Sequence, residues 1–148
     1  MVGGDANSGH YQRDVWYAIE SGDALSWTEA SSDAAPLTDG RILHNTFWHD
    51  DALWIVGGQT LDEFTPTDLS TKTGGPYYDD VWRSDDLGAT WTLVSSGNVW
   101  APNGMMMGGP VKDGYMWLIG GGAYDTDGNP RVYRNESGVP LMAMYGRK

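Results

Sequence analysis

The chain has 148 residues, which is typical of one ordinary domain, and 40% of them are apolar, which is enough for a core. A formal net charge of −11 makes nucleic acid and membrane surfaces unexpected as partners, because both carry negative charge. The absence of cysteine excludes disulfide scaffolds, thiolate metal sites and cysteine nucleophiles.

Apolar residues occur in short runs separated by small polar residues, with 21 glycines and 7 prolines in the chain. Such runs favour strands and turns, and no window repeats apolar residues with the period of a helix, so we predict an all-β fold. No run is long enough for a transmembrane helix, and the N-terminus lacks the basic segment and apolar core of a signal peptide. We suspect an extracellular or cell-surface location, with the export signal absent from this chain.

The first predicted unit is incomplete. Residues 2–4 form the end of a strand, and a polar loop over 5–13 leads into a second strand over 14–20. A turn at 21–24 reverses the chain, and a short return strand runs over 27–30.

The second predicted unit is complete and follows a connection over 31–39 that contains Pro36. Its elements are a first strand over 40–48, a turn at 49–51, a second strand over 52–57, a long loop over 59–79 and a strand–turn–strand hairpin over 80–94. Four antiparallel strands therefore form one unit. Loops as long as the one over 59–79 are usually functional or mobile.

The third predicted unit repeats this order. Its elements are a first strand over 105–111, a turn at 112–114, a second strand over 115–120, a loop over 121–130, a third strand over 131–135 and a fourth over 139–145.

Two sequence motifs recur between the units. Leu53–Gly58 reads Leu-Trp-Ile-Val-Gly-Gly, and Met116–Gly121 reads Met-Trp-Leu-Ile-Gly-Gly, 63 residues later. Asp-Val-Trp begins at Asp14 and again at Asp80, 66 residues later. A period of this size is expected of solenoids, propellers and arrays.

The order of these elements resembles a kelch-type, galactose-oxidase-like β-propeller blade. The resemblance depends on the Gly-Gly pair at 57–58, on the paired aromatic residues Trp82 and Trp91, and on His44 in the first strand, and it covers nearly the whole chain. It implies one kelch-like propeller segment over 1–148, with a partial blade over 1–30, a blade over 40–94 and a blade over 105–146.

About two and a half blades cannot close a ring, because each blade covers a face of its neighbour and propellers have about 4–8 blades. We therefore expect self-association into a homo-oligomer that completes the propeller, unless the chain is a fragment.

The hairpin of the second unit also resembles the Asp-box of sialidase-like propellers, through Ser84-x-Asp86-x-Gly88-x-x-Trp91. We predict that the Ser and Asp side chains bond turn amides, that the glycine takes a positive φ and that the tryptophan packs across the hairpin. A structural role is favoured over a catalytic one.

The antiparallel order places the loops between second and third strands on the same side as the connections between units. Loops on a rigid scaffold usually carry function, so this side is the predicted binding face. Its aromatic residues could stack on a sugar or grip a peptide, or could pack the loops against the sheets: Phe64, Tyr77, Tyr78, Trp100 and Tyr124.

Residues Asp125, Asp127 and Asn129 resemble the start of a calcium loop, with Glu136 at the position of the final ligand of an EF-hand. Pro130 and the lack of flanking helices favour ordinary turn chemistry instead. Calcium is the one candidate cofactor, and none is otherwise expected.

No set of residues supports an enzyme. A galactose-oxidase site needs a cysteine-modified tyrosine, and a sialidase needs three clustered arginines, whereas the candidates here lie on different parts of the repeat: Arg13, Arg41, Arg83, Arg131 and Arg134. We predict a noncatalytic binding or scaffold module for a carbohydrate or a protein loop. The alternatives are a glycan-processing enzyme whose site is completed by other blades, and a structural subunit of a surface or phage particle.

Overall fold

The computed structural model describes residues 1–5, 11–37, 40–60, 78–96 and 109–119, together with the backbone of three short strands near the C-terminus. The strands are β1 (Val2–Asp5), β2 (Tyr11–Ser21), β3 (Ala24–Ser31), β4 (Asn45–His49), β5 (Ala52–Val56), β6 (Val81–Ser84), β7 (Thr92–Ser95), β8 (Val111–Lys112), β9 (Tyr115–Ile119), β10 (Gly122–Tyr124), β11 (Pro130–Val132) and β12 (Met142–Gly146). One 3-10 turn, η1, spans Ala35–Leu37. The all-β prediction is confirmed.

Strands β4 to β7 form a four-stranded antiparallel sheet in sequence order, as predicted for the second unit. We call it the central sheet. Asp50 and Asp51 join β4 to β5 with φ values of 54° and 53°, as in the two-residue turn that matches strand twist. The first strand begins later than the predicted residue 40, because Leu43 has a φ of 56° and Ile42 makes only an isolated bridge to Gln59.

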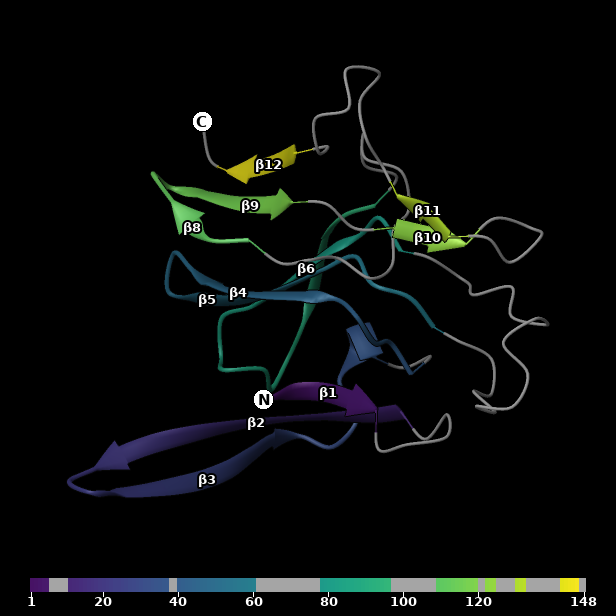
Figure 1. Cartoon of the computed structure of the whole chain (residues 1–148). Coiled ribbons are helices and arrows are strands. Elements are labelled where there is room, and N and C mark those ends of the chain that lie inside the picture. The colour runs from purple at the N-terminus through teal and green to yellow at the C-terminus, as the bar shows by residue number, and fades with distance from the viewer. Residues whose placement is uncertain are drawn as a thin grey trace.

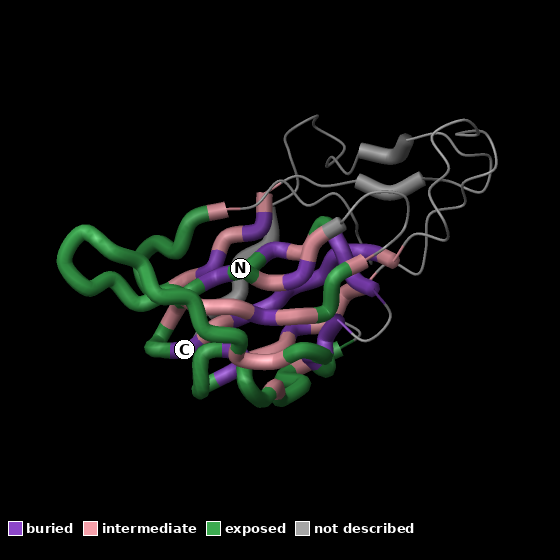
Figure 2. Tube along the Cα trace, turned by 90° about the horizontal axis from the view of Figure 1, so that it is seen from below, coloured by how far each residue is buried: buried purple, intermediate pink, exposed green. Residues whose placement is uncertain are grey.

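Strands β1, β2 and β3 form the N-terminal sheet, in that order and antiparallel. It contains the three strands predicted for the first unit, but β2 and β3 are longer than expected. Their hairpin extends away from the rest of the molecule and is largely exposed (Figures 1 and 2).

The N-terminal and central sheets repeat one another in register. Val2 pairs with Val15 as Val56 pairs with Val81. The pairing of β2 with β3 shifts register directly after Val15, and the pairing of β6 with β7 shifts register directly after Val81. The sequence repeat is therefore a structural repeat in which β1, β2 and β3 correspond to β5, β6 and β7.

Side-chain contacts repeat as well. The Trp16 indole donates to Asp14 Oδ2 at 2.5 Å, and the Trp82 indole donates to Asp80 Oδ2 at 2.7 Å. Each aspartate thus holds the indole that follows it by two residues.

The third sheet, which we call the C-terminal sheet, has the order β12-β9-β8. Its β8–β9 hairpin matches β4–β5. The Trp117 indole donates to the Lys112 carbonyl at 3.3 Å, as the Trp54 indole donates to the His49 carbonyl at 2.9 Å.

Beyond β9 the predicted order of the third unit is wrong. The predicted third strand contains β11, which pairs with β10 in a separate hairpin, and β10 lies inside the predicted loop over 121–130. The predicted fourth strand contains β12, which pairs with β9 over five residues. The loop between β10 and β11 is shorter than the loop that a pairing of β11 with β9 would close, so its closure costs less chain entropy. The edge of β9 then remains available to β12.

The three sheets are stacked with the central sheet between the other two (Figure 1). One core joins the central and C-terminal sheets: Phe47, Ala52, Trp54, Val56, Val81, Met116 and Leu118. The other joins the N-terminal and central sheets around Val15, Ala34, Leu37 and Ile55. Alternate residues of β5 face opposite cores, as the period of a strand requires. Both faces of the central sheet are therefore buried, which the short apolar run over 52–56 reflects.

Candidate functional site

The glycine pair after β5 shapes one end of the central sheet. Gly57 and Gly58 have φ values of 61° and 100°, and a Cβ on Gly58 would lie 2.8 Å from the Ile42 carbonyl oxygen. Only glycine fits this close approach of two backbones at a positive φ. The turn that results places Gln59 opposite Ile42 and brings Tyr78 back to the sheet, where its N–H donates to the Gly58 carbonyl at 2.9 Å.

A buried ion pair lies at this end. Arg41 is 3% exposed, and its two terminal nitrogens donate to the two carboxylate oxygens of Asp80 at 2.5 and 2.8 Å. Arg41 also donates to the Gly57 carbonyl at 3.1 Å. Bidentate pairs of this kind are the strong form of charge-assisted hydrogen bond. The pair locks the segment before β4 to the start of β6, across the end of β5.

Tyr78 lies on top of this pair and is partly exposed. The Arg41 guanidinium carbon is 3.7 Å from the centre of the Tyr78 ring, and the Tyr78 hydroxyl is 2.8 Å from the Thr60 hydroxyl. A guanidinium over an aromatic face is an attractive arrangement that also fixes the ring plane. Tyr78 is therefore a pre-positioned aromatic side chain.

Several buried polar atoms beside the ion pair have no hydrogen-bond partner in the described structure. They are both amide atoms of Gln59, Nδ2 of Asn45, Nδ1 of His44 and Nε of Arg41. Burial and the neighbouring Arg41 charge lower the pKa of His44 to about 4, against a hydrogen bond to the Val2 backbone that raises it. The imidazole is therefore neutral near pH 7.

The connection after β3 packs against the start of β2. Ala34 N–H donates to the Arg13 carbonyl at 2.8 Å, and the Arg13 side chain is 3.3 Å from Asp33. A Cβ on Gly40 would contact the Tyr11 ring at 2.8 Å. The described part of the connection over 31–39 therefore packs against β2, whose first three residues lie within the predicted loop over 5–13.

Of the five predicted binding residues, the structure describes the side chain of Tyr78 alone. Phe64, Tyr77 and Trp100 lie outside the described residues, and Tyr124 is described only as part of the backbone of β10. The candidate calcium ligands Asp125, Asp127 and Asn129 also lie outside the described residues. Within the described residues, no three acidic or histidine side chains are grouped so that they could hold a metal ion.

The opposite end of the central sheet carries the turn between β6 and β7. Ser84 Oγ donates to Asp86 Oδ1 and accepts from the Gly88 N–H, both at 2.8 Å. Asp86 accepts from the Thr90 N–H and hydroxyl at 2.8 and 2.6 Å, and these bonds lower the pKa of its carboxyl. The Trp91 indole donates to the Gly88 carbonyl at 3.0 Å. The hydrogen bonds expected of this turn, and the positive φ of Gly88 at 98°, are present.

Replacing Asp86 with alanine is expected to lower the free energy of unfolding by about 1–2 kcal/mol, because three hydrogen bonds to a carboxylate are lost. Urea unfolding followed by tryptophan fluorescence measures this change. Asp85→Ala is the matched control, since the Asp85 carboxylate is exposed and contacts only the side chain of Arg83 among the bonds described, so its loss should cost less than about 1 kcal/mol. Equal losses for the two variants would contradict the structural role of Asp86.

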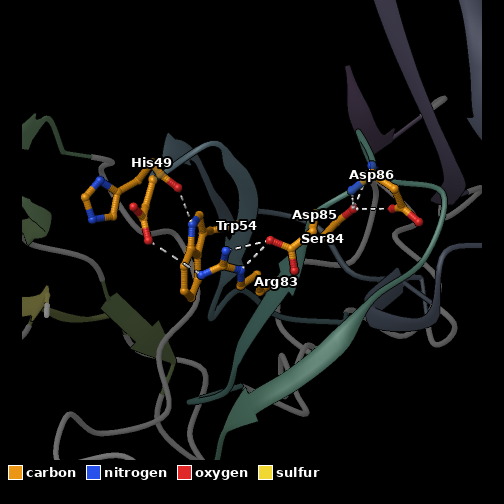
Figure 3. A network of polar contacts seen from close by, with 8 residues as sticks. His49, Trp54, Arg83, Ser84, Asp85 and Asp86 are labelled. Atoms are coloured by element: carbon orange, nitrogen blue, oxygen red, sulfur yellow. Dashed lines mark hydrogen bonds and ion pairs between the residues drawn. The ribbon is translucent and has the colours of Figure 1, made fainter.

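A second network at this end is shown in Figure 3. The Arg83 guanidinium carbon lies 5.1 Å from the centre of the Trp54 ring. Arg83 Nη2 and Nε donate to Asp85 Oδ1 at 2.6 and 2.8 Å, and Arg83 Nη1 is 3.9 Å from Asp50 Oδ2. These residues join the two hairpin turns of the sheet. The two carboxylates are 42% and 69% exposed, so these ion pairs link the turns but contribute little to stability.

Comparisons with protein families and curated proteins identified no match to this chain. Within the described residues there is also no helix with the length and apolar content needed to cross a bilayer.

The sequence analysis did not predict the Arg41–Asp80 ion pair or the backbone bridge between Ile42 and Gln59. The separation of 39 positions between Arg41 and Asp80 hides their contact, since no local periodicity connects them. A signal did exist: the Asp-Val-Trp motif places an aspartate two residues before the tryptophan that it binds in two units.

Proposed function

We propose that this chain is a noncatalytic binding or scaffold module built from kelch-like β-propeller repeats. Its ligand is a carbohydrate or a protein loop, bound at the end of the central sheet that carries Gly57, Gly58 and Tyr78. The observation that carries the proposal is Tyr78, a partly exposed aromatic ring whose plane is fixed by Arg41 at 3.7 Å and by Thr60 at 2.8 Å. Rigid aromatic side chains supply contact area at a low entropic cost.

The repeats support the propeller part of the proposal. Successive units share one register, and each adjoining pair of sheets buries a core between its faces. This is how propeller blades cover one another. The contacts of Ser84, Asp86 and Gly88 are those that an Asp-box would make, and they support a structural use of that turn.

Completion of the ring by further copies of the chain is part of the same proposal. The two cores cover one face of the N-terminal sheet and one face of the C-terminal sheet. Stacking of copies would cover the remaining faces. Light scattering should then give a mass of two or three chains, and a stable monomer would contradict this part.

The alternatives differ in what they predict for glycans. A glycan-processing enzyme, completed by other blades, would turn over sialosides or oxidise sugars, whereas the binding module would retain them unchanged. A structural subunit of a surface or phage particle would do neither and would form large regular assemblies visible by electron microscopy.

A glycan array and turnover assays with the full chain test the binding proposal. Tyr78→Ala should weaken the strongest array signal at least tenfold, and Tyr78→Phe should retain most of it because the ring and its stacking remain. Trp27→Ala is the control, since Trp27 is 55% exposed on the β2–β3 hairpin, toward the opposite end of its sheet. Equal binding by Tyr78→Ala and the unaltered chain, or turnover of a sialoside, would overturn the proposal.

A further inference from the structure

The hairpin of β2 and β3 is longer than its counterpart in the central sheet. Counted from the matching residues Trp16 and Trp82, β6 ends two residues later at Ser84, whereas β2 continues for five residues to Ser21. The hairpin projects beyond the turns of the other sheets (Figure 1). None of its residues from Trp16 to Glu29 belongs to either core. The packing of the sheets on one another therefore leaves this part of the hairpin unused.

The outer edge of β3 is open. In the order β1-β2-β3, β3 lies on the side of β2 away from β1, and no described strand pairs with its outer edge. The six residues 24–29 are all exposed (Figure 2), and Leu25 and Trp27 are 62% and 55% exposed. Sheets usually protect an open edge with lysine, proline or a bulge. The six residues contain no lysine or proline, and the register shift of β3 lies beyond Glu29, so this edge is available for pairing.

The backbone bonds of Trp16 show which residues of β3 face the open edge. Trp16 exchanges two backbone hydrogen bonds with Met1, so its N–H and C=O point away from β3. Backbone groups alternate in direction along a strand, so the next residue, Tyr17, and every second residue after it point toward β3. The residues of β3 that lie opposite them are Thr28, Ser26 and Ala24. The N–H and C=O groups that point out of the open edge therefore belong to Leu25, Trp27 and Glu29.

These three residues make the edge complementary to itself. A two-fold axis beside Trp27 sets Trp27 opposite Trp27 of a second copy, and it sets Leu25 of each copy opposite Glu29 of the other. Each outward N–H then meets an outward C=O, as in an antiparallel pair. A contact in which the same surface is used twice is the usual contact of a two-fold dimer.

Charge selects this register among its neighbours. With Trp27 on the axis, Glu29 lies opposite an apolar side chain. An axis beside Ser26 would set Glu29 opposite Asp23 of the other copy, and an axis beside Glu29 would set the two glutamates opposite each other. Like charges directly opposite one another are destabilising, and more so in a chain with a net charge of −11. An axis beside Thr28 would extend the pairing into the register shift of β3.

We propose that two copies of this chain associate by antiparallel pairing of their β3 strands, with Trp27 on the two-fold axis. The pairing joins two three-stranded sheets into one continuous sheet. It also covers part of Leu25 and Trp27, which lie on one face of the hairpin. Addition of a strand to an open sheet edge is a general mode of recognition, and the added strand here is the same strand of a second copy. The contact is separate from the stacking of sheets that would complete a ring.

The absence of cysteine allows the register to be measured directly by cross-linking. In the proposed pairing, Ser26 lies opposite Thr28 of the second copy as a non-hydrogen-bonded pair, with Cα atoms about 4.5 Å apart, a distance that a disulfide spans. Full-length Ser26→Cys and Thr28→Cys chains, mixed and oxidised, should form a mixed disulfide dimer. Each variant alone should form at least tenfold less dimer, because identical positions are two residues out of register. Peptide mapping after non-reducing electrophoresis identifies the mixed product.

The matched control for cross-linking uses β7, the edge strand of the central sheet. Thr92 and Val94 are exposed on it and have the same spacing as Ser26 and Thr28. A mixture of Thr92→Cys and Val94→Cys chains should give no more dimer than either variant alone.

A change of charge tests the same register without cysteine. Leu25→Glu sets a glutamate opposite Glu29 at two places in the dimer, so the dissociation constant should rise at least tenfold in a sedimentation concentration series. Adding Glu29→Lys restores opposite charges and should recover most of the association. Ile19→Lys is the control, since Ile19 is 57% exposed on the same hairpin but lies on β2, and it should associate like the unaltered chain. Circular dichroism checks that each variant is folded.

Three results would overturn the proposal. The first is an equal yield of disulfide dimer from the mixture and from the single variants. The second is an unchanged particle mass in folded Leu25→Glu, which would show that copies associate by stacking alone. The third is an unaltered chain that sediments as a monomer over the whole concentration series. If Leu25→Glu does not fold, the cross-linking result decides the matter.

Discussion

Replacing Asp80 with asparagine is expected to lower the free energy of unfolding by about 3–5 kcal/mol. The Arg41 side chain is 4% exposed and the Asp80 side chain 14%, so the substitution leaves a guanidinium charge buried without its anion. The same carboxylate accepts the Trp82 indole N–H at 2.7 Å, and this bond weakens too. Urea unfolding followed by tryptophan fluorescence measures the loss.

Asp33→Asn is the matched control for Asp80→Asn. The Asp33 carboxylate also contacts an arginine, Arg13 at 3.3 Å, but the two side chains are 56% and 45% exposed, and an exposed pair contributes about 0–1 kcal/mol. The double variant Arg41→Met with Asp80→Leu removes both charges and should recover part of the loss. A loss below about 1 kcal/mol for Asp80→Asn would contradict the buried ion pair.

Acidification from pH 6.5 to 4 is expected to lower the free energy of unfolding by up to about 3 kcal/mol through His44 alone. The folded protein holds the pKa of His44 at about 4, below its ordinary value of 6.5, because burial and Arg41 disfavour the charged ring. Between these values the unfolded chain binds more protons than the folded one. The stabilisation is therefore complete above pH 6.5 and is lost as the pH falls toward 4.

The measurement is the difference in unfolding free energy between the unaltered chain and His44→Gln, taken at intervals from pH 7 to pH 4. This difference should shrink as the pH falls, because glutamine does not titrate. His49→Gln, at the turn of the same sheet, should retain the pH dependence of the unaltered chain, since His44 is still present. Parallel curves for the unaltered chain and His44→Gln would refute the assignment to His44.

Local features of the fold were predictable because they depend on residues close in sequence. The turn at Asp50 and Asp51, the glycine pair after β5 and the hydrogen bonds of the Ser84–Trp91 turn all follow from side chains within a few residues of one another. The β4–β5 and β6–β7 hairpins of the central sheet followed from such turns, since a tight turn allows only an antiparallel neighbour.

The candidate site was predictable only in part. Tyr78 was identified because it is an aromatic residue in a segment predicted to lie on the loop side of the sheets. Its support by Arg41 was not predictable, because a stacking contact between residues 37 positions apart has no signature in composition or period. The same holds for the unsatisfied amide of Gln59, which looks like an ordinary loop residue in the sequence.

The sequence by itself determined that the chain is all-β, that its units repeat and where most hairpins turn, because strand period, glycine and paired polar side chains act over short distances. Only the tertiary structure decided which strand pairs with β9, that Arg41 neutralises Asp80, and that Oδ1 of the equivalent Asp14 has no hydrogen-bond partner among the described residues. Pairing between distant segments depends on which edges and charges remain available after the local hairpins have formed, and a linear pattern does not record this.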